Sequence, residues 1–423
     1  MTAIAGLAAR EGALRLIGTV LDRGAMVDEG TVSGDAAIKA EARGLADLAL
    51  RRLGQIDAIL SQFVQRMPAG HAGNVLRLMT AELVFARTAP HAAVDLAVRL
   101  AKRGKNGGRI GGLVNAVGRR VAKKGAAIAE GQDAARLNMP DWLWTALAGD
   151  WGEDAARAIA GAHLTPAPHD LTLAVPADAE PLAREIGARV LPTGTVRLEG
   201  RAQISALPGY EAGAWWAQDA AAALPARMIP DPAGKRVLDL CAAPGGKTMQ
   251  LAAAGAQVTA LDRSDRRMKR LSQNLARTKL TAACVTADAL TWAPEAPFDA
   301  ILLDAPCSAT GTIRRHPDLM RRRDRLDLAP LTDLQARMLN AAAKWLAPGG
   351  VLVFCTCSLL RAEGEDQADA FLDRHPAFAR MAVGEEEIPS AFVTSDGDLR
   401  TRPDYWPDLG GLDGFFAARF SRQ

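Results

Sequence analysis

From residue 232 onward, short apolar runs alternate with amphipathic segments, and this alternation constrains the possible folds more than any other feature of the chain. The runs 237–240 and 257–261 enclose a glycine-containing turn and a segment with helical spacing, which indicates a βαβ unit. Runs that are apolar on both faces are typical of parallel strands covered by helices. The pattern therefore predicts an α/β fold with a doubly wound sheet, whose ligands lie at the carboxyl ends of the strands. Further strands are expected near 283–286, 300–303 and 351–355.

The first 135 residues have a different character. Ile56, Ile59 and Leu60 repeat at helical spacing and strand signals are absent, so residues 1–135 are predicted to form an all-α bundle. Over residues 136–228, prolines become frequent and β-like runs such as 171–175 appear, which indicates a small α+β segment. With the sheet domain at 229–423, three domains fit a chain of 423 residues.

Composition excludes several classes of protein. No run approaches the roughly 18 apolar residues of a membrane span, and no secretory signal is evident, so a soluble cytoplasmic protein is expected. The five cysteines include no Cys-x-x-Cys pair, which argues against a disulfide framework and a structural zinc site. We therefore interpret the cysteines as thiols and expect no metal.

The net charge of +3 is small, but the basic residues are unevenly distributed. Residues 102–124 contain eight Lys or Arg and no acidic residue, and residues 314–325 contain six Arg against Asp318 and Asp324. Each block fits a solvated helix face or a surface that contacts phosphates. Beside the motifs described below, the blocks favour RNA: 314–325 as a backbone clamp, and 102–124 as a grip on an adjacent RNA helix.

The turn after the first strand of the sheet holds the sequence Pro244-Gly-Gly246. A glycine turn at a helix N-terminus presents backbone N–H groups to a carboxylate or phosphate. A P-loop for a nucleoside triphosphate needs a glycine five residues before Gly246, where the chain has Cys241, and the spacing of a dinucleotide fingerprint is also absent.

Asp262 ends the next strand, where a carboxylate can bind both hydroxyls of a ribose. Asp288 can bind an adenine amine or be a surface residue, and S-adenosylmethionine fits all of these features better than NAD.

Three segments resemble the RNA cytosine-5 methyltransferases of the NOL1/NOP2/Sun (RsmB/NOP) family: 239–248, 304–311 and 356–358. The continuation through 314–318 is most similar to the bacterial branch that modifies 16S rRNA, in which a NusB-like bundle precedes a Rossmann-like methyltransferase domain. The resemblance implies methylation of carbon 5 of a cytosine in RNA, at a cytosine(967)-type site of 16S rRNA or a small-subunit assembly intermediate. It also implies S-adenosylmethionine as cofactor, a monomer, and neither DNA nor a membrane as partner.

The resemblance assigns the following residues to the cofactor: Cys241, Ala242, Ala243, Pro244, Gly245, Gly246, Lys247, Asp262, Asp288 and Asp304. Arg267 is a weaker candidate on the cofactor side and is otherwise an exposed helix residue. Cys357 has the role of the nucleophile that attacks carbon 6 of cytosine, which activates carbon 5 for methylation. Cys307 is linked to release of the covalent adduct, and Asp304 can hydrogen-bond the N3 atom and amine of the cytosine. Lys247 is a candidate source of the positive charge that a thiolate needs.

Several residues keep two interpretations. Cys355 is either a small buried hydrophobe or a competitor of Cys357, because two residues apart in a strand face the same side. Cys284 is expected to be buried. His316 can contact phosphate or pack in a loop, and the adjacent tryptophans Trp215 and Trp216 can stack on a base or pack in a core. Three activities compete with the preferred one: a non-catalytic RNA-binding assembly factor, a methyltransferase for tRNA or another rRNA site, and a nucleoside triphosphatase.

Overall fold

The computed structural model describes residues 3–104, 107–200, 202–321 and 327–423. The chain forms two compact units. The helical unit contains residues 1–165 and 313–326, and the sheet unit contains residues 166–312 and 327–423. Among the described residues, no helix is both long and apolar enough to cross a membrane. The division into three domains at residues 135 and 228 stays a prediction.

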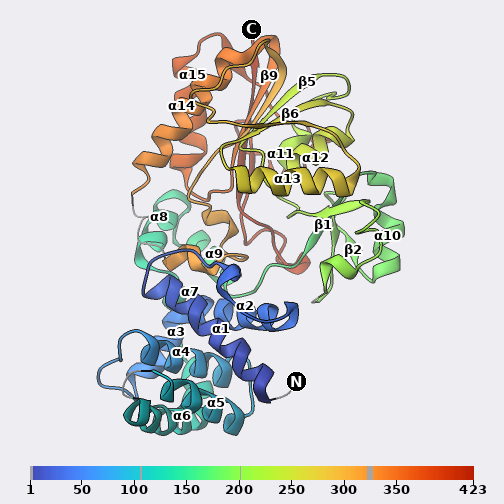
Figure 1. Cartoon of the computed structure of the whole chain (residues 1–423). Coiled ribbons are helices and arrows are strands. Elements are labelled where there is room, and N and C mark those ends of the chain that lie inside the picture. Colours follow the sequence, from blue (N-terminus) through green and yellow to red (C-terminus); the bar gives the residue numbers. More distant parts are fainter. Residues whose placement is uncertain (1–2, 105–106, 201, 322–326) are drawn as a thin grey trace. The chain divides into compact units, whose positions relative to one another are not determined.

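The helical unit is built on amphipathic helices, as the sequence predicts (Figure 1). Ile56, Ile59 and Leu60 are fully buried, and they join one apolar core with residues of α1, α2, α4, α5 and α6. Apolar side chains at helical spacing form one stripe, and stripes of neighbouring helices must bury each other. The helices are α1 Ala3–Leu21, α2 Ala36–Arg51, α3 Leu53–Ser61, α4 His71–Val84, α5 Pro90–Lys102, α6 Gly107–Glu130, α7 Ala134–Asn138, α8 Asp141–Trp151 and α9 Glu153–His163.

The segment 313–326 packs within the helical unit, although it follows a strand of the sheet unit directly in sequence. Its short helix η5 (Pro317–Arg321) contains four buried residues. Arg51 donates a hydrogen bond to the carbonyl oxygen of Arg314 at 2.7 Å, and Arg321 donates one to that of Asn138 at 2.7 Å. Arg314 is buried, and the guanidinium of Arg321 donates to a protein carbonyl, so the predicted phosphate clamp does not apply to these two arginines. Arg322, Arg323 and Arg325 lie outside the described residues.

A small antiparallel sheet begins the sheet unit, in the order β2-β3-β1-β4. Its helix α10 (Ala179–Ile186) packs beside β2 and β3, and Leu171, Val196 and Trp215 lie in the core between them. This is the α+β segment that the sequence predicts. The strands are β1 Asp170–Leu173, β2 Arg189–Val190, β3 Val196–Arg197 and β4 Trp215–Ala217.

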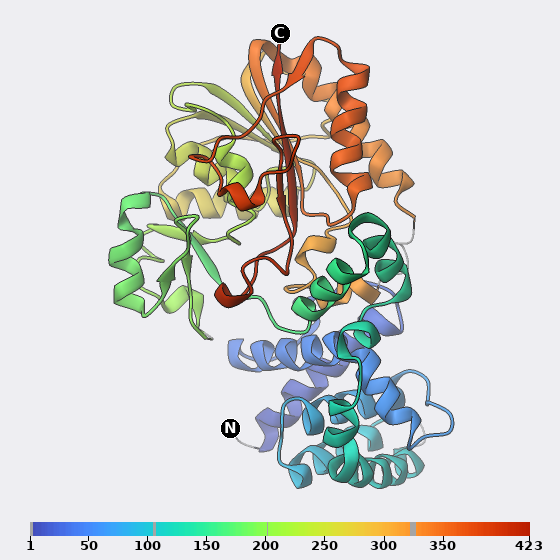
Figure 2. The ribbon, with the colours of Figure 1, turned by 180° about the vertical axis from the view of Figure 1, so that it is seen from behind.

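The large sheet has eight strands in the order β10-β12-β9-β8-β5-β6-β7, with β11 paired to β12. Strands β5 to β9 are parallel, which confirms the doubly wound fold, while β12 runs antiparallel to β9 (Figure 2). The antiparallel strands at the C-terminus were not part of the prediction. The strands are β5 Arg236–Leu240, β6 Gln257–Asp262, β7 Ala283–Thr286, β8 Phe298–Asp304, β9 Leu346–Thr356, β10 Phe378–Arg380, β11 Leu399–Thr401 and β12 Phe415–Arg422.

Helices cover both faces of this sheet. One face packs against α11 (Leu224–Arg227), α12 (Gly246–Ala253) and α13 (Asp265–Thr278). The other packs against α14 (Ala329–Trp345) and α15 (Glu365–Arg374). The strand order reverses direction between β5 and β8, and in such sheets the crevice for a ligand opens at the carboxyl ends of these strands.

Candidate active site

The two glycines that end the turn between β5 and α12 lie where a side chain would be crowded. Gly245, the residue before the helix, has a φ of 107°, and a Cβ there would lie 3.0 Å from Cγ of Leu271. A Cβ on Gly246 would lie 3.1 Å from the side chain of Gln218. The turn is fastened to the neighbouring strand by a hydrogen bond of 3.1 Å from the Ala242 N–H to the Leu261 carbonyl oxygen. Because Gly245 and Gly246 carry no side chains, an anionic group can approach the backbone N–H groups at the N-terminus of α12.

Asp262 lies at the end of β6 with only 2% of its surface exposed. Its carboxylate accepts hydrogen bonds from the backbone N–H groups of Ser264 at 2.9 Å and Ala243 at 3.3 Å. Arg267 pairs with the same carboxylate at 3.1 Å and also donates to the carbonyl oxygen of Ala243. Arg267 is thus fixed beside the turn and is half exposed. Asp288 is exposed after β7, where its carboxylate accepts from the N–H of Leu290 at 2.9 Å.

Lys247 and Asp304 form an ion pair of 2.8 Å at the carboxyl ends of β5 and β8. The Lys247 ammonium also lies 5.0 Å from the ring centre of Phe415. Burial alone would lower the pKa of Lys247, but the charge and hydrogen bond of Asp304, together with other negative neighbours, outweigh burial, so the pKa is raised above its ordinary value. Lys247 is therefore a fixed cation that orients Asp304 and cannot serve as a general base at neutral pH.

Asp239 is a buried carboxyl that the sequence analysis did not single out. It lies in β5 below Lys247, and its Oδ2 accepts a hydrogen bond of 2.6 Å from the hydroxyl of Thr248. Burial raises its pKa to about 7. The signal available in the sequence was its place inside an otherwise apolar strand.

We predict a pH dependence of stability that originates from Asp239. Because the folded state raises its pKa from 3.8 to about 7, the carboxyl stabilises the fold fully below about pH 4, and this contribution is lost as the pH rises toward 7. Each pKa unit corresponds to about 1.4 kcal/mol, so the expected loss is a few kcal/mol. Asp239→Asn should lose less stability than the wild type between pH 5 and 8 in urea unfolding followed by fluorescence.

The control for this prediction is Asp333→Asn, which changes an exposed carboxylate of α14. It should keep the pH dependence of the wild type. Equal pH slopes in the wild type and Asp239→Asn would contradict the assignment to Asp239.

The two loop cysteines lie together. Cys307 follows β8 and Cys357 follows β9, and their Sγ atoms are 3.5 Å apart. The two parallel strands bring their carboxyl ends to the same edge, and the N–H of Gly311 donates to the carbonyl oxygen of Cys357 at 3.0 Å. The pKa of the Cys307 thiol is raised well above its ordinary value, first by its hydrogen bond with Cys357 and then by burial. Cys307 is therefore held as a protonated thiol beside Cys357.

Cys355 differs from Cys357 in its surroundings. It lies inside β9 with no exposed surface, and it packs in the apolar core. Its Sγ lies 3.7 Å from Oδ1 of Asp304, and burial raises its pKa. The prediction that Cys355 is a buried thiol is confirmed. Burial also raises the pKa of the Cys241 thiol, so these two sulfurs disfavour the reactive thiolate form.

The remaining sequence predictions meet different outcomes. Cys284 was expected to be buried and is exposed, because β7 is the edge strand of the sheet.

Trp215 and Trp216 are buried. Their indole N–H groups donate to the carbonyl oxygen of Pro208 and to the side-chain oxygen of Gln218, so the packing interpretation holds. His316 is an exposed residue of the helical unit. The described basic side chains between 102 and 124 are exposed: Lys102, Arg103, Arg109, Arg119, Arg120, Lys123 and Lys124. Lys105 lies outside the described residues.

Comparison with known proteins identifies the family. The family model of 16S rRNA methyltransferase RsmB/F matches residues 228–421, and the NusB family model matches residues 8–123. A ribosomal RNA small subunit methyltransferase B of Xylella fastidiosa is 36% identical over 437 residues, which cover 98% of each chain. The protein of the same name from Salmonella typhi is 36% identical over 395 residues, or 88% of each chain. The chain belongs to the ribosomal RNA small subunit methyltransferase B family.

Solved structures support the fold of this family member. A protein called PH0851 superposes with a TM-score of 0.75 at 21% identity, covering 97% of this chain and 98% of its own. NSun6 from Pyrococcus horikoshii with SFG superposes with a TM-score of 0.58 at 19% identity, covering 67% of this chain and 98% of its own. The NusB-like helical part and the Rossmann-like methyltransferase part are thereby confirmed. The chain is a methyltransferase of this family.

Proposed function

We propose that the chain methylates carbon 5 of a cytosine in 16S rRNA, through a transient bond between Cys357 and carbon 6 of the base. The observation that carries this proposal is the pair of thiols 3.5 Å apart at the ends of β8 and β9, beside Asp304 and the glycine turn. A methyltransferase that modifies nitrogen or oxygen does not need a nucleophilic thiol at this position. Carbon 5 of cytosine does need one, because it is too weakly nucleophilic until carbon 6 has been attacked.

The residues at the strand ends fit S-adenosylmethionine. Gly245 and Gly246 begin α12, where a Cβ would press on Leu271 or Gln218, and Asp262 offers a buried carboxylate that accepts a hydrogen bond from the turn residue Ala243. In the proposal the turn 241–247 holds the amino acid part, Asp262 the ribose, and Asp288 the adenine amine. When bound, the cofactor supplies an electrophilic methyl group.

Asp262 gives a direct test of the cofactor site. Asp262→Asn keeps the size of the side chain but removes the charge that strengthens hydrogen bonds to ribose hydroxyls. We expect S-adenosylmethionine to bind about tenfold or more weakly, from about 1.5–3 kcal/mol for a hydrogen bond to a charged group. Isothermal titration calorimetry measures the change. Asp265→Asn, an exposed carboxylate on the first turn of α13, is the control and should bind as the wild type does.

The protein groups divide the chemistry in the following way. The Cys357 thiolate forms the bond to carbon 6, and the electron pair displaced from the ring reaches carbon 5, which takes the methyl group. In the proposal Asp304, held by Lys247, accepts hydrogen bonds from the amine and from a protonated N3 of the ring, and so stabilises the protonated intermediate. Transfer of the carbon 5 proton to water or a basic side chain then lets the electron pair of that C–H bond re-form the double bond between carbons 5 and 6, and the Cys357 thiolate leaves carbon 6. Cys307 lies where it can take part in this release.

The RNA must present the cytosine outside a duplex, because both faces of a paired base are covered by its neighbours. The exposed basic side chains of α6 offer phosphate contacts that position RNA without reading its sequence. A monomer is expected, since all the proposed groups come from one chain. A target in tRNA or in another rRNA remains the alternative outcome of the experiment that follows.

The test is transfer of a labelled methyl group to 16S rRNA transcribed without modification. Nuclease digestion and mass spectrometry should find 5-methylcytidine at a single position. The protein and cofactor are incubated in parallel with a tRNA mixture and with 23S rRNA. Methylation only of tRNA or 23S rRNA would reject the substrate, and a product other than 5-methylcytidine would reject the chemistry.

A further inference from the structure

Glu363 is a fully buried carboxylate that the proposed chemistry does not use. It ends the short helix η7 (Arg361–Glu363), just after the Cys357 loop. A buried carboxylate is costly unless donors surround it, so its presence beside two reactive thiols calls for a physical reason.

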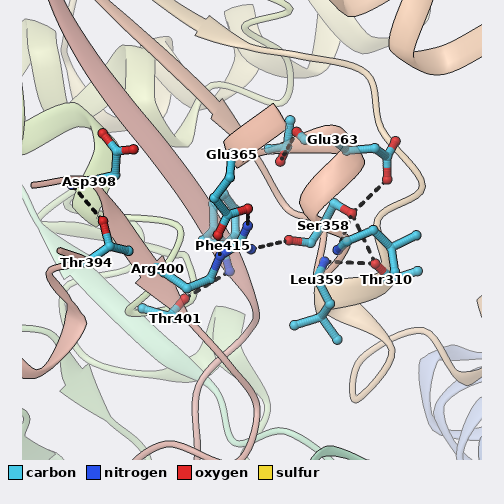
Figure 3. Close-up of polar contacts among 12 residues, drawn as sticks. Thr310, Ser358, Leu359, Glu363, Glu365, Thr394, Asp398, Arg400, Thr401 and Phe415 are labelled. Carbon is cyan, nitrogen blue, oxygen red and sulfur yellow. Dashed lines mark hydrogen bonds and ion pairs between the residues drawn. The ribbon is translucent and has the colours of Figure 1, made fainter. Parts of the chain in front are cut away.

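The donors to Glu363 come from both cysteine loops. Oε1 accepts from the backbone N–H of Ser308 at 2.8 Å, one residue after Cys307. Oε2 accepts from the hydroxyl of Ser358 at 2.7 Å, one residue after Cys357. Figure 3 shows Glu363 and Ser358 turned toward each other. A single carboxylate therefore bridges the residues that follow the two thiols.

A third element completes the bridge. Gln335 of α14 donates one hydrogen bond to Glu363 Oε1 at 3.1 Å and another to the carbonyl oxygen of Pro306 at 2.9 Å. The hydroxyl of Thr310 lies 3.3 Å from that of Ser358 and accepts from the N–H of Leu359 at 2.9 Å (Figure 3). Each loop is thus bonded to the other and to a helix of the sheet unit.

We propose that Glu363 is a positioning residue that ties the Cys307 loop to the Cys357 loop and so keeps the two thiols in contact. The inference rests on the proposed function for its catalytic consequence. A buried hydrogen-bond network that joins several elements restricts their motion, and a reacting group must be held closely by such surroundings to be productive. Glu363 touches neither thiol and acts through Ser308 and Ser358.

The surrounding charges fit this role. Arg400 donates to the carbonyl oxygen of Ser358 at 2.7 Å, and its charge is balanced by an ion pair with Glu365 at 2.5 Å. Arg400 thus holds the Ser358 backbone without pairing with Glu363 in the contacts described here, and Glu363 Oε1 faces the Cys307 loop through the Ser308 N–H. Its charge is one of the causes that raise the pKa of Cys307, after the hydrogen bond with Cys357 and burial. The same carboxylate favours the protonated form of Cys307.

The experiment compares Glu363→Gln with the wild type in two assays. The first is alkylation of Cys307 by iodoacetamide as a function of pH, read by peptide mass spectrometry. Loss of the carboxylate charge and of the bridge should both make Cys307 more reactive, so we expect alkylation at pH 8 to be at least tenfold faster. The second assay is methyl transfer to RNA, where kcat should fall about a hundredfold while KM for RNA and for the cofactor changes less than threefold.

Asp398→Asn is the matched control, because Asp398 is a buried carboxylate of the same unit that pairs with Arg380 and contacts neither loop. It should leave both assays unchanged within threefold. An unchanged alkylation profile in Glu363→Gln, or an equal change in Asp398→Asn, would overturn the positioning role. Absence of methyl transfer by the wild type would instead reject the proposed function, and the alkylation assay would still decide the role of Glu363.

If Glu363→Gln does not fold, Ser358→Ala removes the bridge from the other side and keeps the carboxylate. We expect kcat to fall at least tenfold with KM unchanged. A kcat equal to that of the wild type would overturn the proposal.

Discussion

Replacing Cys357 by alanine will abolish formation of a covalent complex with RNA that contains 5-fluorocytosine. In the wild type, the sulfur bonds to carbon 6 and the methyl group is added at carbon 5, but the fluorine cannot leave as the proton does. The wild-type complex should therefore survive denaturation and appear as a band of reduced mobility in a denaturing gel. Without the sulfur, carbon 5 is not activated, and methyl transfer to ordinary RNA should fall roughly 10³-fold or more.

The control for this prediction is Cys355→Ala. Cys355 is fully buried in β9, and its thiol contacts Asp304. The variant should still form the complex, although a small cavity will cost some stability. A complex that survives in Cys357→Ala and disappears in Cys355→Ala would reassign the nucleophile. Full methyl transfer by Cys357→Ala would reject covalent catalysis altogether.

Replacing Cys307 by alanine should have the opposite effect on the complex. The Cys307 thiol lies 3.5 Å from Cys357, and its pKa is raised by that contact and by burial, so it is held protonated next to the adduct. Without it, the bond between Cys357 and carbon 6 should form but break slowly. The complex should then accumulate on ordinary RNA in the presence of S-adenosylmethionine, and multiple-turnover methylation should stop after about one equivalent.

The double variant Cys307→Ala, Cys357→Ala provides the control for accumulation, because it lacks the sulfur that forms the bond. It should show no complex. Multiple turnover by Cys307→Ala at the wild-type rate would remove the proposed role in release. Accumulation that does not depend on Cys357 would show that another thiol reacts.

Much of the sheet unit could be predicted from local sequence. The strands β5, β6, β7, β8 and β9 lie where apolar runs predicted them. For the inner strands of the sheet, a run that is buried on both faces has few alternatives. The glycine turn could also be predicted from the sequence. The positive φ at Gly245 and the close approach of Leu271 both favour glycine there. Strands β10, β11 and β12 escaped prediction, because they are paired antiparallel at one side of the sheet and carry no βαβ spacing.

The predictions of side-chain exposure were wrong where exposure depends on what packs against a segment. Cys284 was predicted to be buried from its position in an apolar run, but β7 has a neighbour on one side alone, which leaves its surface open. Arg314 and Arg321 looked like free cations in a basic block, but Arg314 is buried and Arg321 is half-buried in the helical unit, where it donates to the carbonyl oxygen of Asn138. Sequence periodicity reports which residues share a face and does not report what covers that face.

The sequence by itself determined how strands and helices alternate along the chain from β5 to β9, and which residue types stand at each strand end. Both follow from local spacing and backbone conformation. Only the tertiary structure decided which groups meet. The contact between Cys307 and Cys357, the ion pair between Lys247 and Asp304, and the bridge through Glu363 join residues separated by tens of positions in the chain. Such contacts depend on how parallel strands align their carboxyl ends and how helices pack on them, and no local pattern encodes that geometry.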